Sequence, residues 1–361
     1  MNIQSVLSSY KVWVLAPYLH TDDPNLQYYY DFTEGIKEYT RVFDELKCEW
    51  EWQPVGIHDY HDIIRQIGSS ANGKQPLVIN LCDGDEINGT PGVSVIEALK
   101  KEGLVFTGSN RFFYEITTSK IPMKQAFEAA GVPTPKWEVM NEEGSNLKGL
   151  FDRIGTPLIL KPAISGGSMG IGIKNVVHTE TECTTRLEEM RGGYHGWDLA
   201  GGGIIAEAFI KGREFTTLVV GSSDSELIFY PPAERLFHQG LPETEQFLSY
   251  DRLWETYEDE KPVDNDQFLY NYGEPEAALL APLRELSLAA YKAVGGTGYG
   301  RIDIRMDKET GNLYVLEVNA QCGLSEDENF TSIGAILRFA RKSFTQLTCE
   351  ILEDALKRHK P

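Results

Sequence analysis

Short apolar runs alternate with amphipathic stretches in the first part of the chain. KVWVLA at 11–16 and PLVINLC at 76–82 are typical of buried strands, and FTEGIKEYTRVFDELK at 32–47 has helical periodicity. The glycine-rich loop DGDEINGTPG at 83–92 follows the second strand, and the helix VSVIEALKKEG and the strand LVFTGS come next. This alternation predicts a parallel sheet covered on both faces, with the 83–92 loop at its ligand-binding edge.

Strands predominate in the middle of the chain, after a helix expected at about 115–130. TPLILKPA at 156–163 leads into the loop SGGSMGIGIKNV, and GIIAEAFI at 203–210 is followed by FTTLVVG. We expect a small separate domain here. The polar segment 231–275 is longer than an ordinary connection, which favours a functional or a disordered loop, and a lid over a bound nucleotide is one possibility. A helix at about 275–294, the strands YGRIDIRMD and LYVLEVN around KETGN, and a helical end complete the pattern.

Composition narrows the classes of protein. The chain of 361 residues is long enough for two or three domains, and its 34 basic and 54 acidic residues give a net charge of −20. Nucleic acids and anionic membranes attract positive charge, so we expect neither as a partner. The five cysteines are scattered and lack CxxC spacing, which indicates neither a disulfide framework nor a zinc site.

The beginning of the sequence bears on the compartment. MNIQSVLSSYKVWVLAPYLH contains a short apolar run but no signal-peptide h-region and no small-residue cleavage site. No apolar stretch approaches the roughly 20 residues that cross a bilayer. We therefore expect a cytoplasmic protein.

The strands around KETGN carry polar side chains at alternating positions. Arg301 and Asp303 share one face of the first strand, and Glu317 and Asn319 share one face of the second. A register that pairs Met306 with Tyr314 sets Asp303 opposite Glu317, about 5 Å apart at Cβ. A hard cation such as magnesium would relieve the repulsion between these carboxylates. A solvent-facing acidic pair is the alternative.

Two further patterns are compatible with a nucleotide site. Lys161 ends an apolar strand before a loop rich in glycine, where backbone N–H groups can approach a phosphate, although the loop is neither a Walker A motif nor a dinucleotide fingerprint. A flexible hairpin is the alternative. In AEAFIKGREF, Glu207 and Glu214 flank a turn and could bind ribose hydroxyls, or could simply be exposed.

In this order, the motifs resemble the ATP-grasp superfamily and, within it, the D-alanine–D-alanine ligase group. The resemblance runs from about residue 76 to the end through FTGS, TSKIPMKQAFEAAGVPTP, LILKP, GGSMGIGIKNV, AEAFIKGREFT, GRIDIRMD and YVLEVNAQCGLS. It implies an α/β (α+β) fold of three domains, with ATP between the central and C-terminal ones. We place a Rossmann-like substrate domain at 1–115, the central ATP-grasp domain at 116–212 and the C-terminal ATP-grasp domain at 213–361.

The resemblance also implies roles for individual residues. Lys120 and Lys161 would contact the phosphates and the adenine side, under a loop of Gly166, Gly167 and Ser168. Glu207 would help to hold adenine beside the connector Ala208 and Phe209, and Glu214 would bind the ribose. Asp303, Glu317 and Asn319 would ligate two magnesium ions, with manganese as a possible substitute, and Arg301 would stabilise transition-state charge. The expected catalytic residues are Arg301, Ser168 and Lys161.

The implied reaction needs no protein nucleophile. A substrate carboxylate attacks the γ-phosphoryl group, and an amine displaces phosphate from the resulting acyl phosphate to form an amide or an imine-type C–N bond. Such chemistry depends on positioning and charge neutralisation. The expected partners are a small-molecule acid and an amino acid, and homodimers are usual in the resembled group.

The chain departs from the resembled ligases in the substrate half. It lacks their glycine-rich first turn, it has Asp83-Gly84 in place of a His-Gly motif, and Cys322-Gly323 replaces a Pro-Gly pair. Arg252 and Trp254 are the nearest candidates for the Lys-Tyr pair of the mobile loop. The expected substrate contacts are Asp83, Gly323, Leu324 and Ser325.

These departures predict a ligase that does not make D-alanyl-D-alanine. Related ligases attach an amino acid to a metabolite scaffold, as in mycosporine-like natural products, and this is the preferred subtype. The alternatives are a D-alanine–D-alanine ligase with a divergent pocket and a nucleotide-binding pseudo-enzyme. A Rossmann oxidoreductase is disfavoured because the glycine fingerprint is missing.

Overall fold

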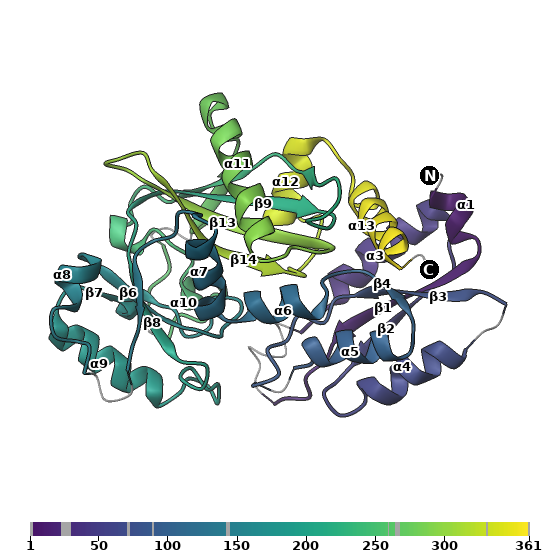
Figure 1. Ribbon diagram of the computed structural model, residues 1–361, viewed down its shortest axis with the longest axis horizontal. Helices are drawn as coiled ribbons and strands as arrows, with labels where there is room; N and C mark the ends of the chain where they lie inside the picture. The colour runs from purple at the N-terminus through teal and green to yellow at the C-terminus, as the bar shows by residue number, and fades with distance from the viewer. Residues whose placement is uncertain are drawn as a thin grey trace.

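The computed structural model describes residues 3–22, 30–70, 73–88, 90–141, 145–258, 260–263, 268–329 and 331–359. These residues form three sheets, which in sequence order have four, four and six strands (Figure 1). The sheets follow one another along the sequence, and helices pack against each of them.

The first sheet is parallel and has the order β2-β1-β3-β4. Its strands are β1 (Tyr10–Pro17), β2 (Trp50–Val55), β3 (Gln75–Asn80) and β4 (Val105–Phe106). The accompanying helices are α1 (Ile3–Leu7), α3 (Thr33–Leu46), α4 (Tyr60–Ser69) and α5 (Val93–Lys101). The expected parallel sheet is confirmed, with β2 as a strand that the apolar pattern did not reveal.

The single helix expected at about 115–130 is two helices, α6 (Arg111–Thr118) and α7 (Lys120–Ala129). Ser119 separates them with an extended backbone (φ −109°, ψ 128°). The Lys120 amide then donates to the Ala163 carbonyl at 2.8 Å, just after the strand that leads into the glycine-rich loop. The break therefore places the beginning of α7 beside that loop.

The second sheet is antiparallel and has the order β5-β8-β6-β7. Its strands are β5 (Trp137–Val139), β6 (Leu158–Pro162), β7 (Val176–Val177) and β8 (Ile204–Ala208), with a 3₁₀ turn at Ile173–Asn175. The helices α8 (Leu150–Ile154) and α9 (Glu180–Arg191) cover it. The glycine-rich loop joins β6 to β7.

The third sheet is antiparallel, with the order β12-β11-β9-β13-β14 and β10 paired to β9. Its strands are β9 (Gly212–Val220), β10 (Ile228–Phe229), β11 (Ala233–Phe237), β12 (Tyr270–Gly273), β13 (Tyr299–Asp307) and β14 (Leu313–Ala320). A 3₁₀ turn (Glu243–Glu245) and the helices α10 (Tyr250–Leu253), α11 (Ala277–Ala293), α12 (Ser332–Ala340) and α13 (Phe344–Arg358) complete this part. The segment 231–275 thus supplies two strands and is not a loop throughout.

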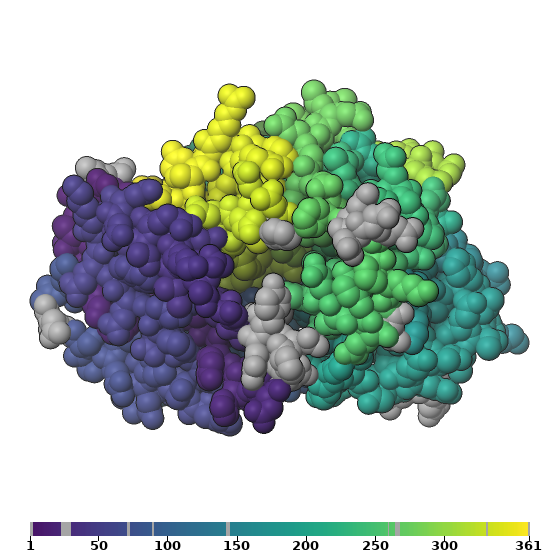
Figure 2. All heavy atoms as spheres, turned by 180° about the vertical axis from the view of Figure 1, so that it is seen from behind, coloured from purple at the N-terminus to yellow at the C-terminus, as the bar shows by residue number. Residues whose placement is uncertain are grey.

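The last two helices pack back on the first part of the chain. Tyr39 of α3 meets Phe344 of α13 edge-on at 5.4 Å, and one apolar core contains residues of β1, α3, α12 and α13. Figure 2 shows this junction between the N-terminal residues in purple and the C-terminal ones in yellow. The two ends of the sequence therefore form one wall of the molecule.

No helix in the described ranges is long and apolar enough to cross a membrane. The three sheets fall within residues 10–106, 137–208 and 212–320. The domain bounds inferred from the sequence stay a prediction.

Two glycines with similar φ angles allow a test of the contact between the segment before α6 and the residue before β13. Gly298 (φ +76°) lies so close to Gly108 that an added Cβ would be 2.1 Å from the Gly108 carbonyl oxygen. A Cβ added at Gly311 (φ +72°) would have no described atom within 4 Å. We expect Gly298→Ala to lower the free energy of unfolding by at least about 3 kcal/mol and Gly311→Ala by roughly 1 kcal/mol. Urea denaturation followed by circular dichroism would measure both, and equal losses would contradict the steric argument.

Candidate active site

The paired strands β13 and β14 carry the polar residues predicted to bind a metal. Asp303 lies opposite Glu317, as expected, and Arg301 lies opposite Asn319. The expected pairing of Met306 with Tyr314 is wrong, because Met306 pairs with Leu313. The register shifts by one residue between Asp303 and Ile304, where the bulge leaves Leu316 without an opposite residue.

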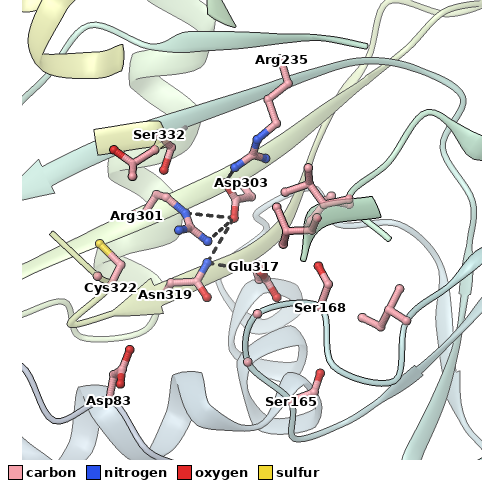
Figure 3. Close-up of a pocket in the computed structure, with 18 of the residues that line it drawn as sticks. Asp83, Ser165, Ser168, Arg235, Arg301, Asp303, Glu317, Asn319, Cys322 and Ser332 are labelled. Carbon is pink, nitrogen blue, oxygen red and sulfur yellow. Dashed lines mark hydrogen bonds and ion pairs between the residues drawn. The ribbon is translucent and has the colours of Figure 1, made fainter. Parts of the chain in front are cut away.

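Asp303 is the centre of this group (Figure 3). Arg301 Nε and Nη2 donate to Asp303 Oδ2 at 3.2 and 3.0 Å, and Asn319 Nδ2 donates to the same oxygen at 3.2 Å and to Glu317 Oε1 at 3.3 Å. Burial alone would raise the pKa of Asp303, but Arg301 and Arg235 outweigh it and lower the pKa. The carboxylate is therefore charged at neutral pH.

The same group fits a hard cation in part. Within the part of the chain that the structure describes, Asp303 Oδ1 is buried and has no hydrogen-bond partner, and Arg235 Nη2 lies 3.6 Å from it. Among the described residues, no cluster of three or more His, Cys, Asp or Glu side chains is arranged to hold a metal. Two carboxylates and one amide oxygen would thus hold magnesium only if phosphate oxygens completed its coordination.

A buried carboxylate between lysines forms the neighbouring group. Lys161 Nζ lies 2.6 Å from Glu207 Oε1, and Lys124 contacts Glu207 Oε2. Burial by itself would raise the pKa of Glu207, but the attraction of the two lysines outweighs it and lowers the pKa to about 2. Lys120 donates to Ser165 Oγ at 3.2 Å and lies 3.9 Å from Glu317. The sequence analysis missed Lys124, although its spacing of four residues from Lys120 on α7 was a usable signal.

A second buried network surrounds Glu214. Arg235 donates to Glu214 Oε1, and Arg305 Nε donates to Oε2 at 3.0 Å. Arg305 also donates to the Ile210 carbonyl at 2.7 Å and lies over the Phe209 ring. Neither arginine was identified from the sequence, because Arg235 lies in the polar segment without a motif and Arg305 reads as an ordinary strand residue.

The glycine-rich loop is covered by the polar segment. Gly167 (φ +54°) and Ser168 (φ +62°) both adopt left-handed conformations. Trp254 Nε1 donates to the Gly167 carbonyl at 2.8 Å, and the Tyr250 amide donates to the Ile171 carbonyl at 2.8 Å. The helix α10 and the residue after it therefore hold this loop from outside.

The substrate end is positioned by Gln321, a residue that the sequence analysis did not select. Gln321 is buried with φ +53°, its Nε2 donates to the Cys82 carbonyl at 2.6 Å, and its Oε1 accepts from the Ser109 amide at 3.3 Å. This bridge between β14 and the end of β3 brings Asp83 toward Cys322 (Figure 3). The Asp83 side chain is exposed within the cavity. The surrounding protein nevertheless removes part of the bulk water from its carboxyl group, and this desolvation raises the pKa of Asp83 to about 6.

Most of these groups line one cavity of about 660 Å³, although Lys124 does not belong to its lining. One end is apolar, with Phe209 and Phe247 meeting edge-on at 5.8 Å and Ile159 packed against them. Every residue that the sequence placed in the site lines this cavity: Asp83, Lys120, Lys161, Gly166, Gly167, Ser168, Glu207, Ala208, Phe209, Glu214, Arg301, Asp303, Glu317, Asn319, Gly323, Leu324 and Ser325.

Comparisons of sequence agree with the motifs. The family described as D-ala D-ala ligase C-terminus matches residues 126–352. The D-alanine--D-alanine ligase of Xanthomonas axonopodis pv. citri (strain 306) is 29% identical over 284 residues, which cover 77% of this chain and 78% of that protein. The D-alanine--D-alanine ligase of Stutzerimonas stutzeri (strain A1501) is 27% identical over 302 residues, or 84% and 83% of the two chains.

Solved structures share the fold along almost the whole chain. The D-alanine--D-alanine ligase of Bacillus anthracis complexed with ATP superposes with a TM-score of 0.68 at 20% identity, covering 97% of this chain and 98% of that one. VanG D-Ala:D-Ser ligase of Enterococcus faecalis gives a TM-score of 0.66 at 15% identity, covering 98% and 100%. The expected ATP-grasp fold is confirmed.

The chain belongs to the D-alanine–D-alanine ligase-like family of the ATP-grasp superfamily. It is accordingly an ATP-dependent ligase that forms C–N bonds, of a class that uses ATP and a divalent metal ion.

The pairing of Glu207 predicts a pH-dependent effect on stability. Because the folded pKa is lowered to about 2, the stabilisation is complete above the ordinary pKa of 4.5 and is lost as the pH falls toward 2. We expect Glu207→Gln to lower the free energy of unfolding by about 3 kcal/mol at pH 7, with the difference from the parent shrinking below pH 4.5. Urea unfolding between pH 2.5 and 7 would test this, with the exposed Glu285→Gln as control. A difference that does not vary with pH would contradict the pairing.

Proposed function

We propose that this enzyme joins a small-molecule acid to an amino acid through an acyl phosphate. The observation that carries the proposal is the cavity that an apolar cluster, Lys120 and Lys161, a glycine-rich loop and the Asp303–Glu317 pair line together. These groups suit the parts of ATP: base, phosphates and metal.

The nucleotide would lie between the second and third sheets. The base would pack against Phe209 and Ile159 beside Ala208 and Glu207, and the ribose would approach Glu214. Lys120 and Lys161, the glycines 166 and 167, and Ser168 would contact the phosphates. Asp303, Glu317 and Asn319 would hold two magnesium ions, which would neutralise phosphate charge.

The residues of the chain would act by charge and position. A substrate carboxylate oxygen attacks the γ-phosphorus while the bond to the β-phosphate oxygen breaks, and ADP leaves. The amine nitrogen then attacks the acyl carbon, phosphate leaves, and the nitrogen loses its proton. Arg301 faces the cavity beside Asp303, where its positive charge would stabilise the pentavalent phosphoryl group and the tetrahedral carbon centre.

We propose further that the product is not D-alanyl-D-alanine. Asp83, Gly323, Leu324 and Ser325 line the substrate end, where the sequence departs from the resembled ligases. An acid scaffold and an amino acid are the preferred substrates, as in ligases of mycosporine-like compounds.

A D-alanine–D-alanine ligase is the second candidate, because the curated relatives carry that name. A pseudo-enzyme is disfavoured because Lys161, Arg301 and the Asp303–Glu317 pair are all present. A cytoplasmic homodimer and the three domain bounds stay predictions.

ATP-dependent phosphate release across amino acids, singly and in pairs, with and without scaffold acids, would test the substrate proposal. We expect release to require an acid other than D-alanine together with an amino acid. Release with D-alanine alone would contradict the proposal and support the second candidate. Nucleotide binding without any release would favour the pseudo-enzyme.

Glu317→Gln tests the metal-binding role. We expect at least about a hundredfold loss of turnover, because the neutral amide weakens the binding of a divalent cation at the phosphates. The thermal unfolding temperature should stay close to that of the parent. Glu309→Gln, an exposed change in the turn after β13, is the matched control and should leave turnover intact. Near-normal activity of Glu317→Gln would rule out the assignment.

A further inference from the structure

The cavity has two apolar ends that belong to different clusters of the molecule. The first contains Phe209 and Phe247 and would take the base of the nucleotide. The second belongs to the core that joins the N-terminal and C-terminal parts of the chain, and its members that line the cavity are Tyr39, Trp52, Leu81, Tyr272, Cys322 and Leu324. In Figure 3, Cys322 lies on the opposite side of Asn319 from Ser168. The second apolar end is therefore on the substrate side of the charged groups.

The nucleotide and the reacting groups do not account for this second end. The proposed nucleotide has one base, which the first end would hold. Phosphates, the reacting carboxyl group and the amine are polar, and contact with apolar surface does not favour them. An apolar surface in a binding cavity favours an apolar part of a ligand, because both are removed from water together. The second end thus calls for an apolar group on a substrate.

Aromatic rings form the part of this end that comes from residues 30–52. Phe32 and Trp52 lie with ring centroids 5.6 Å apart and planes tilted by 50°, and Tyr39 lies 6.1 Å from Trp52. All three residues line the cavity, and Phe32 and Trp52 are partly exposed. Aromatic rings pack well against other rings, through offset stacking and edge contacts. This surface favours a flat ring over a flexible chain.

Gly35 leaves space beside these rings. It lies on α3 and lines the cavity. A Cβ added there would meet Phe32 Cδ1 and Trp52 Cη2, both at 3.9 Å, which is ordinary van der Waals contact. Glycine weakens a helix relative to alanine, and the helical backbone at this position does not require it. The missing side chain therefore keeps a patch of the cavity open beside both rings.

We propose that the second apolar end binds a flat apolar ring, aromatic or conjugated, on the acid substrate, whose carboxyl group lies at the phosphates. The ring packs against Trp52 and Phe32 at the patch that Gly35 leaves open, and Leu81 and Leu324 add aliphatic surface. This inference rests on the proposed function and narrows the acid substrate to compounds that carry a ring apart from the reacting carboxyl group.

Phenylpropionate, cyclohexylpropionate and propionate are the probes, because they share the carboxyl group and differ in the ring. NMR titrations with the full chain saturated with Mg·ADP should show at least about tenfold tighter binding of phenylpropionate than of propionate. Cyclohexylpropionate should bind more weakly than phenylpropionate, because its puckered ring has no flat face to stack. Binding of phenylpropionate no tighter than that of either other acid, or no binding of any of them, would contradict the inference.

Gly35→Ala separates a role in binding from a role in folding. The added methyl group should weaken phenylpropionate binding at least about fivefold, because it occupies the patch beside the rings, and should hardly affect propionate. The thermal unfolding temperature should not fall, because alanine favours the helix. Gly68→Ala on α4, which is not among the described lining residues, is the matched control and should leave both affinities unchanged. An unchanged phenylpropionate affinity in Gly35→Ala would overturn the inference.

Trp52→Leu and Trp50→Leu form a second matched pair, on one strand. Trp52 lines the cavity, whereas Trp50 stacks on Phe43 with ring centroids 5.2 Å apart and is not among the described lining residues. The preference for phenylpropionate over cyclohexylpropionate should disappear in Trp52→Leu and persist in Trp50→Leu. A preference that survives in Trp52→Leu contradicts the inference, and if a tryptophan variant does not fold, Gly35→Ala decides.

Mg·ADP binding is recorded in the same samples, which separates this inference from the proposed function. If Mg·ADP binds and the ring preference is absent, the ring site alone is wrong. If Mg·ADP does not bind, the proposed function is overturned as well.

Discussion

The arrangement of the active site depends on one β-bulge. From the turn onward, the pairing of Met306 with Leu313 would set Asp303 opposite Leu316 if the ladder continued without interruption. Side chains alternate between the two faces, so Glu317 and Asn319 would then point away from Asp303. The shift between Asp303 and Ile304 restores them to the same face. An extra residue in β14 is thus the reason that two carboxylates, an amide and Arg301 meet in one cavity.

The buried charges around this point alternate in sign. Glu207 lies between two lysines, and Arg235 lies between Glu214 and Asp303. Burying any one of these charges alone would be very costly, and the opposite neighbours offset much of that cost. This series of charged groups ends in cations that face the cavity, and their charge suits the cavity to a polyanion such as a nucleoside triphosphate. The residues that balance the buried charges are therefore the same ones that would bind the proposed nucleotide.

The substrate half is assembled differently, from segments at the two ends of the sequence. The contact of α3 with α13 and the bridge from Gln321 to the end of β3 fix Asp83 and Glu38 against the loop at 323–326. These contacts connect residues more than 200 positions apart, such as Cys82 and Gln321. The part of the chain that differs from the resembled ligases is the part whose geometry depends on such distant contacts.

The sequence by itself determined the class of fold, the order of the motifs and part of the lining of the cavity, because short apolar runs, glycine-rich loops and i, i+2 spacing are local properties. The opposition of Asp303 and Glu317 was also predictable, although the assumed register at Met306 was wrong. Only the tertiary structure decided that Lys124 and Lys161 share Glu207, that Arg235 and Arg305 hold Glu214, and that Ser325 donates to Glu38. The physical reason is that hydrogen bonds and ion pairs between distant segments leave no periodic trace in the sequence.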